Sequence, residues 1–206
     1  GWPIQYGALE TVPYVGGRRD ISQVDGQAPS VTVDTWQIGA AFNWRRGGDW
    51  FAIRPDYMGN DFDRSRVLSL NATWTPVRNG VLNDWRQYGE GFISWRPAFD
   101  LRAVAGTFHR QGDRTDQQSE DFFRLGSQFG LAVKSDNPRW PLVASVSETY
   151  LPALNGGDDI DFLQSRLAWA LDPKQYFTIE VIYTDGQRTD LDMEERAWKV
   201  SLAAKY

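Results

Sequence analysis

The last thirteen residues, Glu194-Glu195-Arg196-Ala197-Trp198-Lys199-Val200-Ser201-Leu202-Ala203-Ala204-Lys205-Tyr206, alternate between two kinds of side chain. One face of an extended chain would carry Trp198, Val200, Leu202, Ala204 and Tyr206, and the other would carry Ala197, Lys199, Ser201, Ala203 and Lys205. A period of two is typical of a β-strand with one apolar face. The stretch therefore predicts a strand over residues 194–206 that ends on an aromatic residue.

The same alternation recurs along most of the chain. Leu68, Leu70 and Trp74, for example, alternate with Ser69, Asn71 and Thr73. No stretch of useful length has the period of an amphipathic helix. The chain is therefore predicted to be all-β, with ten strands near residues 32–45, 49–58, 64–75, 83–96, 100–110, 121–134, 139–150, 160–172, 174–184 and 194–206.

The links between these expected strands alternate in length. The links 111–120, 151–159 and 185–193 are long and polar, whereas 97–99, 135–138 and 173 are short. This pattern is typical of an antiparallel up-and-down meander with tight turns at one end and larger loops at the other. Counting back along the chain, the medium link 76–82 falls at the loop end and 59–63 at the turn end.

The N-terminal segment, residues 1–30, has a weaker pattern. Ile4, Tyr6 and Ala8 are compatible with a further strand, whereas the polar stretch from Gly16 to Ser30 is typical of a loop. The segment is therefore expected to be an extra strand or strands, a plug or a linker. Two more strands would raise the total to twelve.

Composition excludes several classes of function. The 206 residues contain no Cys and one His, so a disulfide framework, a thiolate metal site and a multi-His metal centre are excluded, and neither a metal nor another cofactor is expected. The formal net charge of −5 argues against nucleic acid as the main partner. The longest apolar run, Leu167 to Leu171, is far shorter than the roughly 20 residues of a membrane-spanning helix.

Alternation alone does not say which face of the sheet meets solvent. The polar faces are mostly small and neutral, whereas a solvated sheet normally carries more Lys and Glu. Aromatic residues also recur at both ends of the apolar faces, eight or ten residues apart, as in Trp36 and Trp44, Trp85 and Trp95, Trp140 and Tyr150, and Trp198 and Tyr206, with Trp74 as a further member. In tilted strands these spacings correspond to roughly 20–25 Å along a barrel axis, the height of an outer-membrane hydrocarbon band.

The terminal strand and the aromatic pairs together resemble the Gram-negative outer-membrane β-barrel class. The match is close in Trp198, Val200, Leu202, Ala204 and Tyr206, and general in form over the rest of the expected barrel. The resemblance implies an antiparallel up-and-down transmembrane β-barrel over residues 31–206, located in the bacterial outer membrane. Its expected partners are outer-membrane lipid, and the β-barrel assembly machinery through the C-terminal strand. A further protein chain or domain is also open.

The polar faces would then line the lumen, and the expected lining residues are Asn71, Arg124, Lys134, Arg166, Glu180, Glu195, Lys199 and Lys205. Mixed signs favour internal ion pairs that brace and partly occlude the lumen. We expect a narrow passive channel or a structural membrane anchor. A surface receptor or adhesin, the membrane domain of a longer export protein, and a soluble lipocalin-like binding barrel remain alternatives. Twelve-stranded oligosaccharide channels are similar in size, but their lumens are strongly basic.

An enzyme is not expected. His109 is the only histidine and lies near a long link, where outer-membrane proteases of the omptin kind place their catalytic residues. However, Thr107 occupies the position two residues before it, where those proteases have Asp. Outer-membrane lipases and deacylases have Ser two residues after the His, where this chain has Gln111. A hydrolase at the rim that uses His109 therefore remains a minor alternative, because no base–nucleophile pair accompanies the histidine.

Overall fold

The computed structural model describes residues 4–6, 9–22, 30–61, 64–89, 91–110, 121–135, 137, 141–171, 177–187 and 195–204. These residues form one antiparallel sheet of 13 strands, in accordance with the all-β prediction, and they contain no helix. The strands are β1 (Ile4–Tyr6), β2 (Leu9–Ser22), β3 (Ser30–Arg46), β4 (Asp49–Asn60), β5 (Arg66–Thr75), β6 (Arg86–Gln87), β7 (Ile93–Arg110), β8 (Asp121–Ser135), β9 (Leu142–Leu151), β10 (Ala153–Asn155), β11 (Ile160–Ala170), β12 (Phe177–Gly186) and β13 (Glu195–Ala204). No described segment is a helix that is long and apolar enough to cross a membrane.

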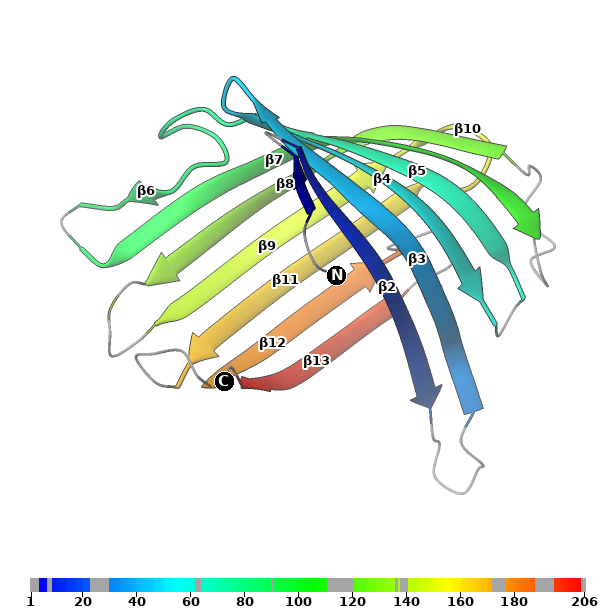
Figure 1. Ribbon diagram of the computed structural model, residues 1–206. Coiled ribbons are helices and arrows are strands. Elements are labelled where there is room, and N and C mark those ends of the chain that lie inside the picture. Colours follow the sequence, from blue (N-terminus) through cyan, green and yellow to red (C-terminus); the bar gives the residue numbers. More distant parts are fainter. Residues whose placement is uncertain are drawn as a thin grey trace.

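Each long strand pairs with the next one along the chain. The order is β1-β2-β3-β4-β5-β7-β8-β9-β11-β12-β13, while β6 pairs with β7 and β10 pairs with β8. The sheet curves strongly, with β2 and β3 on one side of the hollow and β12 and β13 on the other (Figure 1). The strands are staggered, because one register row passes through Trp44, near the turn end of β3, and reaches Tyr150, near the loop end of β9. Stagger of this kind is what the shear of a barrel requires.

The sheet is not closed. Among the described residues no pairing joins β13 to β1 or β2. The short strand β1 covers only Leu9 to Thr11 of β2, so residues 12–22 of β2 have a free edge on that side within the described part of the chain. The structure therefore establishes a curved antiparallel meander of 13 strands, and the expected totals of ten and twelve strands are wrong.

The count rises from ten to 13 because β1, β2 and β10 are additional strands, and the largest differences from the prediction lie in β2 and β7. The stretch from Gly16 onward was expected to be a loop, but β2 runs through Gly16 and Gly17 to Ser22. Pairing along the whole length with β3 overrides the weak strand propensity of its glycines. Conversely, segments 83–96 and 100–110 were expected to be two strands, but residues 93–96, the expected link 97–99 and residues 100–110 form the single strand β7.

Asn83 explains how β7 continues past Pro97, which lacks an amide hydrogen. The backbone N–H of Asn83 donates to the Pro97 carbonyl (2.8 Å), and its side chain accepts from the Phe99 N–H (2.9 Å) and donates to the Phe99 carbonyl (2.7 Å). These bonds give partners to backbone groups of β7 at positions that lie beyond the end of β5. Asn83 adopts a left-handed conformation, with φ of 56°, which asparagine tolerates better than most residues.

The continuous β7 also corrects the expected placement of the N-terminal links. Link 61–65 lies at the same end as 111–120 and 152–159, which we call the loop end. Link 76–92 lies at the opposite end with the tight turn at Gly47 and Gly48, which we call the turn end. The prediction placed each of these two links at the other end of the sheet. It divided β7 into two strands, and one extra strand in an up-and-down meander reverses the expected direction of every strand before it.

The two faces of the sheet differ as the alternation predicts. The largest outward side chains are exposed and apolar, and they include Val200 (73 % exposed), Trp198 (71 %), Leu202 (67 %) and Phe129 (60 %). The concave face carries polar groups such as Asp56, Ser69 and Asn71, together with a small apolar cluster described below. The usual arrangement of a water-soluble β protein, with apolar residues packed inside, is inverted over most of the sheet.

Candidate functional site

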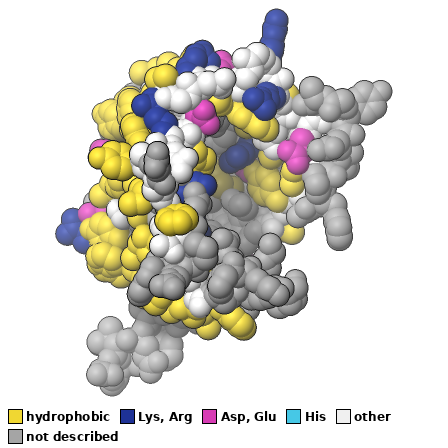
Figure 2. Space-filling model, turned by 90° about the vertical axis from the view of Figure 1, so that its left-hand side faces the viewer, with side chains coloured by type: hydrophobic (Ala, Val, Ile, Leu, Met, Phe, Trp, Pro, Cys, Tyr) yellow, Lys and Arg dark blue, Asp and Glu magenta, His cyan; other side chains and the backbone are white. Residues whose placement is uncertain are grey.

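The concave face encloses a cavity of about 860 Å³, which we call the polar cavity. Its wall is built by residues from β2, β3, β4, β5, β7, β8, β9 and β11. The charged residues of the wall are Glu10, Arg54, Asp56, Asp100 and Arg102. The carboxamides are Gln37, Asn43, Asn71, Gln128 and Gln164, and the hydroxyl groups belong to Tyr14, Ser69, Thr73, Thr75, Ser147 and Thr149. The surface is hollowed when the molecule is viewed from the side of β6 and the first residues of β7 (Figure 2).

One hydrogen-bond network crosses β2, β4 and β5 at the wall of the cavity. The Tyr14 hydroxyl donates to Oδ1 of the buried Asp56. The Asn71 amide donates to Oδ2 of Asp56 (3.1 Å) and to the Ser69 hydroxyl (3.3 Å). This network fixes the orientation of a buried carboxylate by hydrogen bonds to neutral donors.

Gly39 of β3 makes this network possible. In the register it lies between Tyr14 and Asp56. A Cβ atom at Gly39 would lie 2.6 Å from Asp56 Oδ1 and 2.9 Å from the Tyr14 hydroxyl. The missing side chain therefore lets the Tyr14 phenol reach across β3 to the carboxylate on β4.

A second network lies toward the turn end. The Thr75 hydroxyl donates to Oδ1 of Asp100 (2.6 Å), and Arg102 lies 3.7 Å from Oδ2 of the same carboxylate. Arg102 also donates to the Gln128 side chain on β8. These contacts tie β5, β7 and β8 together across the concave face and leave Asp100 and Arg102 mutually compensated.

Other polar groups of the wall are not engaged in this way. Within the described part of the chain, no side-chain hydrogen bond or ion pair is made by Glu10, Gln37, Asn43, Arg54 or Gln164. The polar cavity thus combines fixed networks with groups that are free to bind water or a solute.

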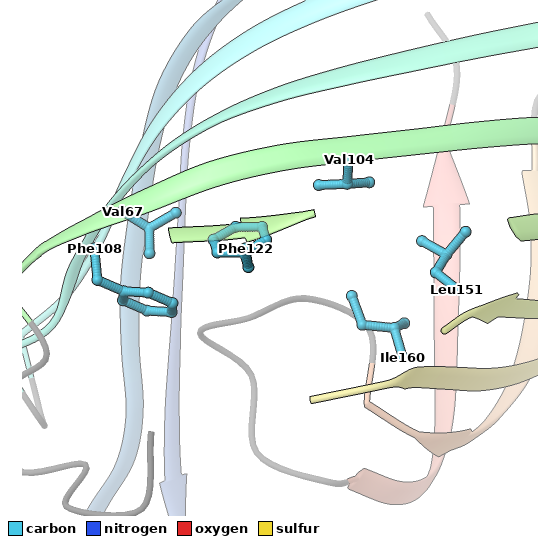
Figure 3. Close-up of a cluster of buried hydrophobic side chains, with 6 residues drawn as sticks. All are labelled: Val67, Val104, Phe108, Phe122, Leu151 and Ile160. Atoms are coloured by element: carbon cyan, nitrogen blue, oxygen red, sulfur yellow. The ribbon is translucent and has the colours of Figure 1, made fainter. Parts of the chain in front are cut away.

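The concave face carries buried apolar side chains at the loop end. Val67, Val104, Phe108, Phe122, Leu151 and Ile160 form what we call the apolar cluster, and Met58 packs against it. Its residues come from β5, β7, β8, β9 and β11 (Figure 3). The centres of the Phe108 and Phe122 rings are 5.6 Å apart. Gly106 leaves room for the Phe122 ring, because a Cβ atom at Gly106 would lie only 2.4 Å from Phe122 Cζ. The cluster borders the polar cavity through Val104, Leu151 and Ile160.

Arg124 is enclosed beside this cluster. It is 0 % exposed, and its guanidinium lies 4.5 Å from the centre of the Phe122 ring. Its Nε donates to the Asp158 carbonyl (2.6 Å) in the link between β10 and β11. Gly157, with φ of +69°, brings this link against the guanidinium, because a Cβ atom there would lie 2.6 Å from Nη2. The loop end is therefore closed locally by a chain segment that wraps around Arg124.

Cations and aromatic rings meet at the turn end. The charged groups of Arg96 and Lys134 lie 5.0 and 5.1 Å from the centre of the Trp85 ring. Arg86 lies 4.7 Å from the centre of the Trp95 ring. These contacts fasten link 76–92 and β6 to β7 and β8 through cation–π attraction.

Asp49, the first residue of β4, anchors link 76–92 to that strand. It accepts hydrogen bonds from the Arg78 guanidinium (2.5 Å), the Val77 N–H (3.0 Å) and the Trp74 indole (3.1 Å). The Arg78 hydrogen bond is the main reason why the pKa of the Asp49 carboxyl lies below its ordinary value of 3.8.

The expected lining residues occupy different surroundings. Asn71 lines the polar cavity, Arg124 is buried beside the apolar cluster, and Lys134 contacts Trp85 at the turn end. Arg166 and Glu180 pair with each other on β11 and β12. Lys199 is exposed on β13, opposite Ile182 in the register. The side chain of Glu195 and the whole of Lys205 lie outside the described residues.

Most of the expected interface aromatics gather near the two ends of the strands. Toward the loop end, Trp36 lies 5.5 Å from Tyr57, Trp198 lies 4.8 Å from Tyr183, and Tyr150 donates to Asp159 (3.4 Å). Toward the turn end, Trp44 stacks on Phe51 at 5.4 Å, and Trp74, Trp85 and Trp95 make the contacts described above. Trp140 and Tyr206 lie outside the described residues.

His109 lies near the loop end of β7 and is exposed, with its ring 6.2 Å from the Tyr57 ring. Gln111 lies outside the described residues. The described part of the chain contains no group of three or more His, Asp or Glu residues that could hold a metal ion.

The apolar cluster was missed by the sequence analysis. A signal existed in the adjacent pair Phe122 and Phe123, because two neighbouring aromatic residues put an apolar group on both faces of β8. The distant contacts to Leu151 and Ile160, by contrast, depend on register and could not be inferred.

Comparison of the chain with known protein families, with curated proteins and with solved structures gives no match.

Proposed function

We propose that the protein is an integral β-barrel of the bacterial outer membrane that acts as a narrow passive channel. The observation that carries the proposal is the exposed apolar face, on which Val200, Leu202 and Phe129 point away from the sheet. In water this surface would be costly, whereas acyl chains would cover it at no cost. The polar cavity on the opposite face supplies the lumen.

The aromatic residues support the same orientation. Trp36 and Trp44 lie toward opposite ends of β3, and the other described interface aromatics gather toward one end or the other. Aromatic girdles at the two lipid headgroup levels are a regular feature of outer-membrane barrels. The apolar residues between them form the band that would face the hydrocarbon.

A membrane requires closure, because an open sheet edge is not tolerated in lipid. We propose that β13 closes on residues 12–22 of β2. The path from β2 to β13 contains an even number of strands, so these two strands run antiparallel. The ten residues of β13 also match the eleven residues of that edge in length.

Disulfide cross-linking tests the closure in a chain that has no native cysteine. Val15→Cys on the outer face of β2 is combined in turn with Trp198→Cys, Val200→Cys and Leu202→Cys on β13. We expect one of the three pairs to oxidise in high yield. The matched control combines Val15→Cys with Leu70→Cys on β5, three strands further along the sheet, and should not cross-link. Absence of a cross-link in all three pairs would contradict closure through β2.

Membrane insertion has its own test. A detergent-folded sample should migrate differently on a denaturing gel before and after boiling. Brominated lipid should quench the emission of the outward Trp198. A Trp198→Phe variant identifies that contribution, because the remaining tryptophans provide the background. A sample that is folded but unquenched by lipid would contradict the proposal.

The apolar cluster favours a second candidate, a barrel that serves as an anchor or scaffold. Phe108 and Phe122 fill part of the concave face at the loop end and are almost fully buried. Conductance in planar bilayers distinguishes the two candidates. A reproducible open level supports the channel, whereas a folded, inserted and silent protein supports the anchor.

A further inference from the structure

We infer that the polar cavity binds a neutral saccharide of two or three sugar units. The inference rests on the proposed barrel, because β13 and β2 must close the wall around the ligand. At about 860 Å³ the cavity lies within the range of roughly 300–1,000 Å³ found for small-molecule sites. Its lining decides the chemical class of the ligand.

The charge of the wall disfavours an ionic ligand. Asp100 faces Arg102, and Asp56 is held by the Tyr14 hydroxyl and the Asn71 amide. Only Glu10 and Arg54, of opposite sign, hold no hydrogen bond or ion pair among the charged wall residues that the structure describes. A ligand of one sign would therefore meet both attraction and repulsion from Glu10 and Arg54, and the wall as a whole, with three carboxylates and two guanidinium groups, offers an excess of only one negative charge to offset the ligand's desolvation.

The neutral groups of the wall match sugar hydroxyls. Each hydroxyl of a sugar both donates and accepts, and a carboxamide offers both functions as well. Gln37, Asn43 and Gln164 carry carboxamides that are not hydrogen-bonded within the described residues. These groups would have to be matched by water or by a ligand.

The register places some of these groups in one row with space between them. Glu10 pairs with Asn43, Asn43 with Ala52, and Ala52 with Thr73. Because Ala52 and Ala41, on the neighbouring strand, have small side chains, they leave a depression in the wall between the polar side chains. A ring-shaped ligand could lie in this depression with its edge toward the row.

An aromatic ring borders the cavity toward the turn end. Trp50 is part of the wall and is half exposed, with the Arg45 guanidinium 5.5 Å from its ring centre. A sugar ring has an apolar C–H face as well as a polar edge, and an indole ring offers a flat apolar surface to it. The combination of an aromatic surface with carboxamides fits a saccharide better than a fully apolar solute or an ion.

The apolar cluster defines the other limit of the site. Leu151 and Ile160 border the cavity at the loop end, and they offer a sugar hydroxyl no hydrogen bond. The ligand would therefore be held between the row of Asn43 and the Trp50 ring, on the turn-end side of the cluster.

Isothermal titration calorimetry on the detergent-folded full chain tests the inference. Three probes of equal length are used: maltotriose, which is neutral, a glucosamine trimer, which is cationic, and a galacturonate trimer, which is anionic. We expect saturable heat with maltotriose and at least tenfold weaker binding of both charged trimers. Equal binding of all three, or tighter binding of a charged trimer, would overturn the inference.

Substitutions in the cavity wall test whether the heat of maltotriose binding arises in the polar cavity. Asn43→Ala and Thr73→Ala, both in the register row beside the Trp50 ring, should each weaken maltotriose binding about two- to tenfold, the range expected for one lost hydrogen bond. Asn79→Ala, on an exposed position outside the cavity wall, is the matched control and should bind like the native chain. Unchanged affinity in both wall variants would overturn the inference.

The gel shift on boiling is recorded for every sample. A folded protein without maltotriose heat would overturn the saccharide inference and leave the membrane barrel standing. A protein that folds only as a water-soluble species would overturn the membrane barrel, and with it the inference.

Discussion

The two ends of the concave face are built by the same strands but differ in chemistry. On β7, Phe108 and Val104 belong to the apolar cluster, whereas Arg102 and Asp100, on the same face toward the turn end, belong to the polar cavity. The cluster is buried and closely packed, while the cavity is hydrogen-bonded and partly unengaged. The inside of the sheet is therefore layered along its axis, and a single rule of polar inside and apolar outside does not describe it.

The largest effect is expected from breaking the apolar cluster. Phe122→Ala removes a ring that is 2 % exposed and contacts Phe108, and it should lower the free energy of unfolding by about 3–5 kcal/mol. Urea unfolding of the protein in lipid vesicles measures this loss. The same variant should raise any bilayer conductance if the cluster obstructs the lumen.

Phe123→Ala is the matched control, because its ring points outward from the next position of β8. In the proposed membrane barrel, acyl chains would fill the space that it leaves, so only the transfer free energy would be lost and no cavity would remain. A Phe123→Ala variant that is as unstable as Phe122→Ala would contradict the contrast between the two faces.

The next effect is expected in the polar cavity. Asp56→Ala leaves the Tyr14 hydroxyl and the Asn71 amide without their acceptor, and it should cost about 1–3 kcal/mol in unfolding free energy. Asp56→Asn keeps one acceptor oxygen and should recover part of the loss. If the alanine variant is as stable as the native chain, water replaces the carboxylate and the network does not brace the wall.

The outward face could be predicted from the sequence, and the reason is physical. Lipid or solvent contacts impose no register, so Val200 and Leu202 need only alternate with Lys199 and Ser201 to be assigned to one face. The layered inner face could not be predicted in this way. Phe122 becomes part of a cluster only because Leu151 and Ile160 arrive from β9 and β11 at the same height.

The strand errors have an equally specific origin. The expected link 97–99 contains Pro97, which cannot donate in a ladder, but Asn83 forms hydrogen bonds with the Pro97 carbonyl and with Phe99, and β7 continues through this stretch. The glycines of β2 suggested a loop, but β3 pairs with them throughout. In both places a partner distant in sequence overrode a local preference.

A smaller, pH-dependent effect is expected at the turn end, which is the far limit of the cavity. Because the folded pKa of Asp49 is lowered, its stabilising contribution is complete above the unfolded value of 3.8 and is lost as the pH falls through the folded pKa. Asp49→Asn should therefore make unfolding less sensitive to acid below that value. The free energy of unfolding measured as a function of pH in both proteins checks this. The same loss of stability below pH 3.8 in both proteins would contradict it.

The smallest effect is expected from the Arg166–Glu180 pair, which lies on the concave side of β11 and β12 next to Gln164 of the cavity wall and outside the apolar cluster. The Arg166 side chain is nearly half exposed, so solvent screens the pair, and Arg166→Ala should change the unfolding free energy by less than about 1 kcal/mol. The Glu180→Gln variant and the double variant complete a thermodynamic cycle for the pair. A coupling free energy well above that value would mean that closure with β2 buries this region of the lumen more deeply than the open sheet does. The cycle therefore tests closure on the inner face, whereas the cysteine pairs test it on the outer face.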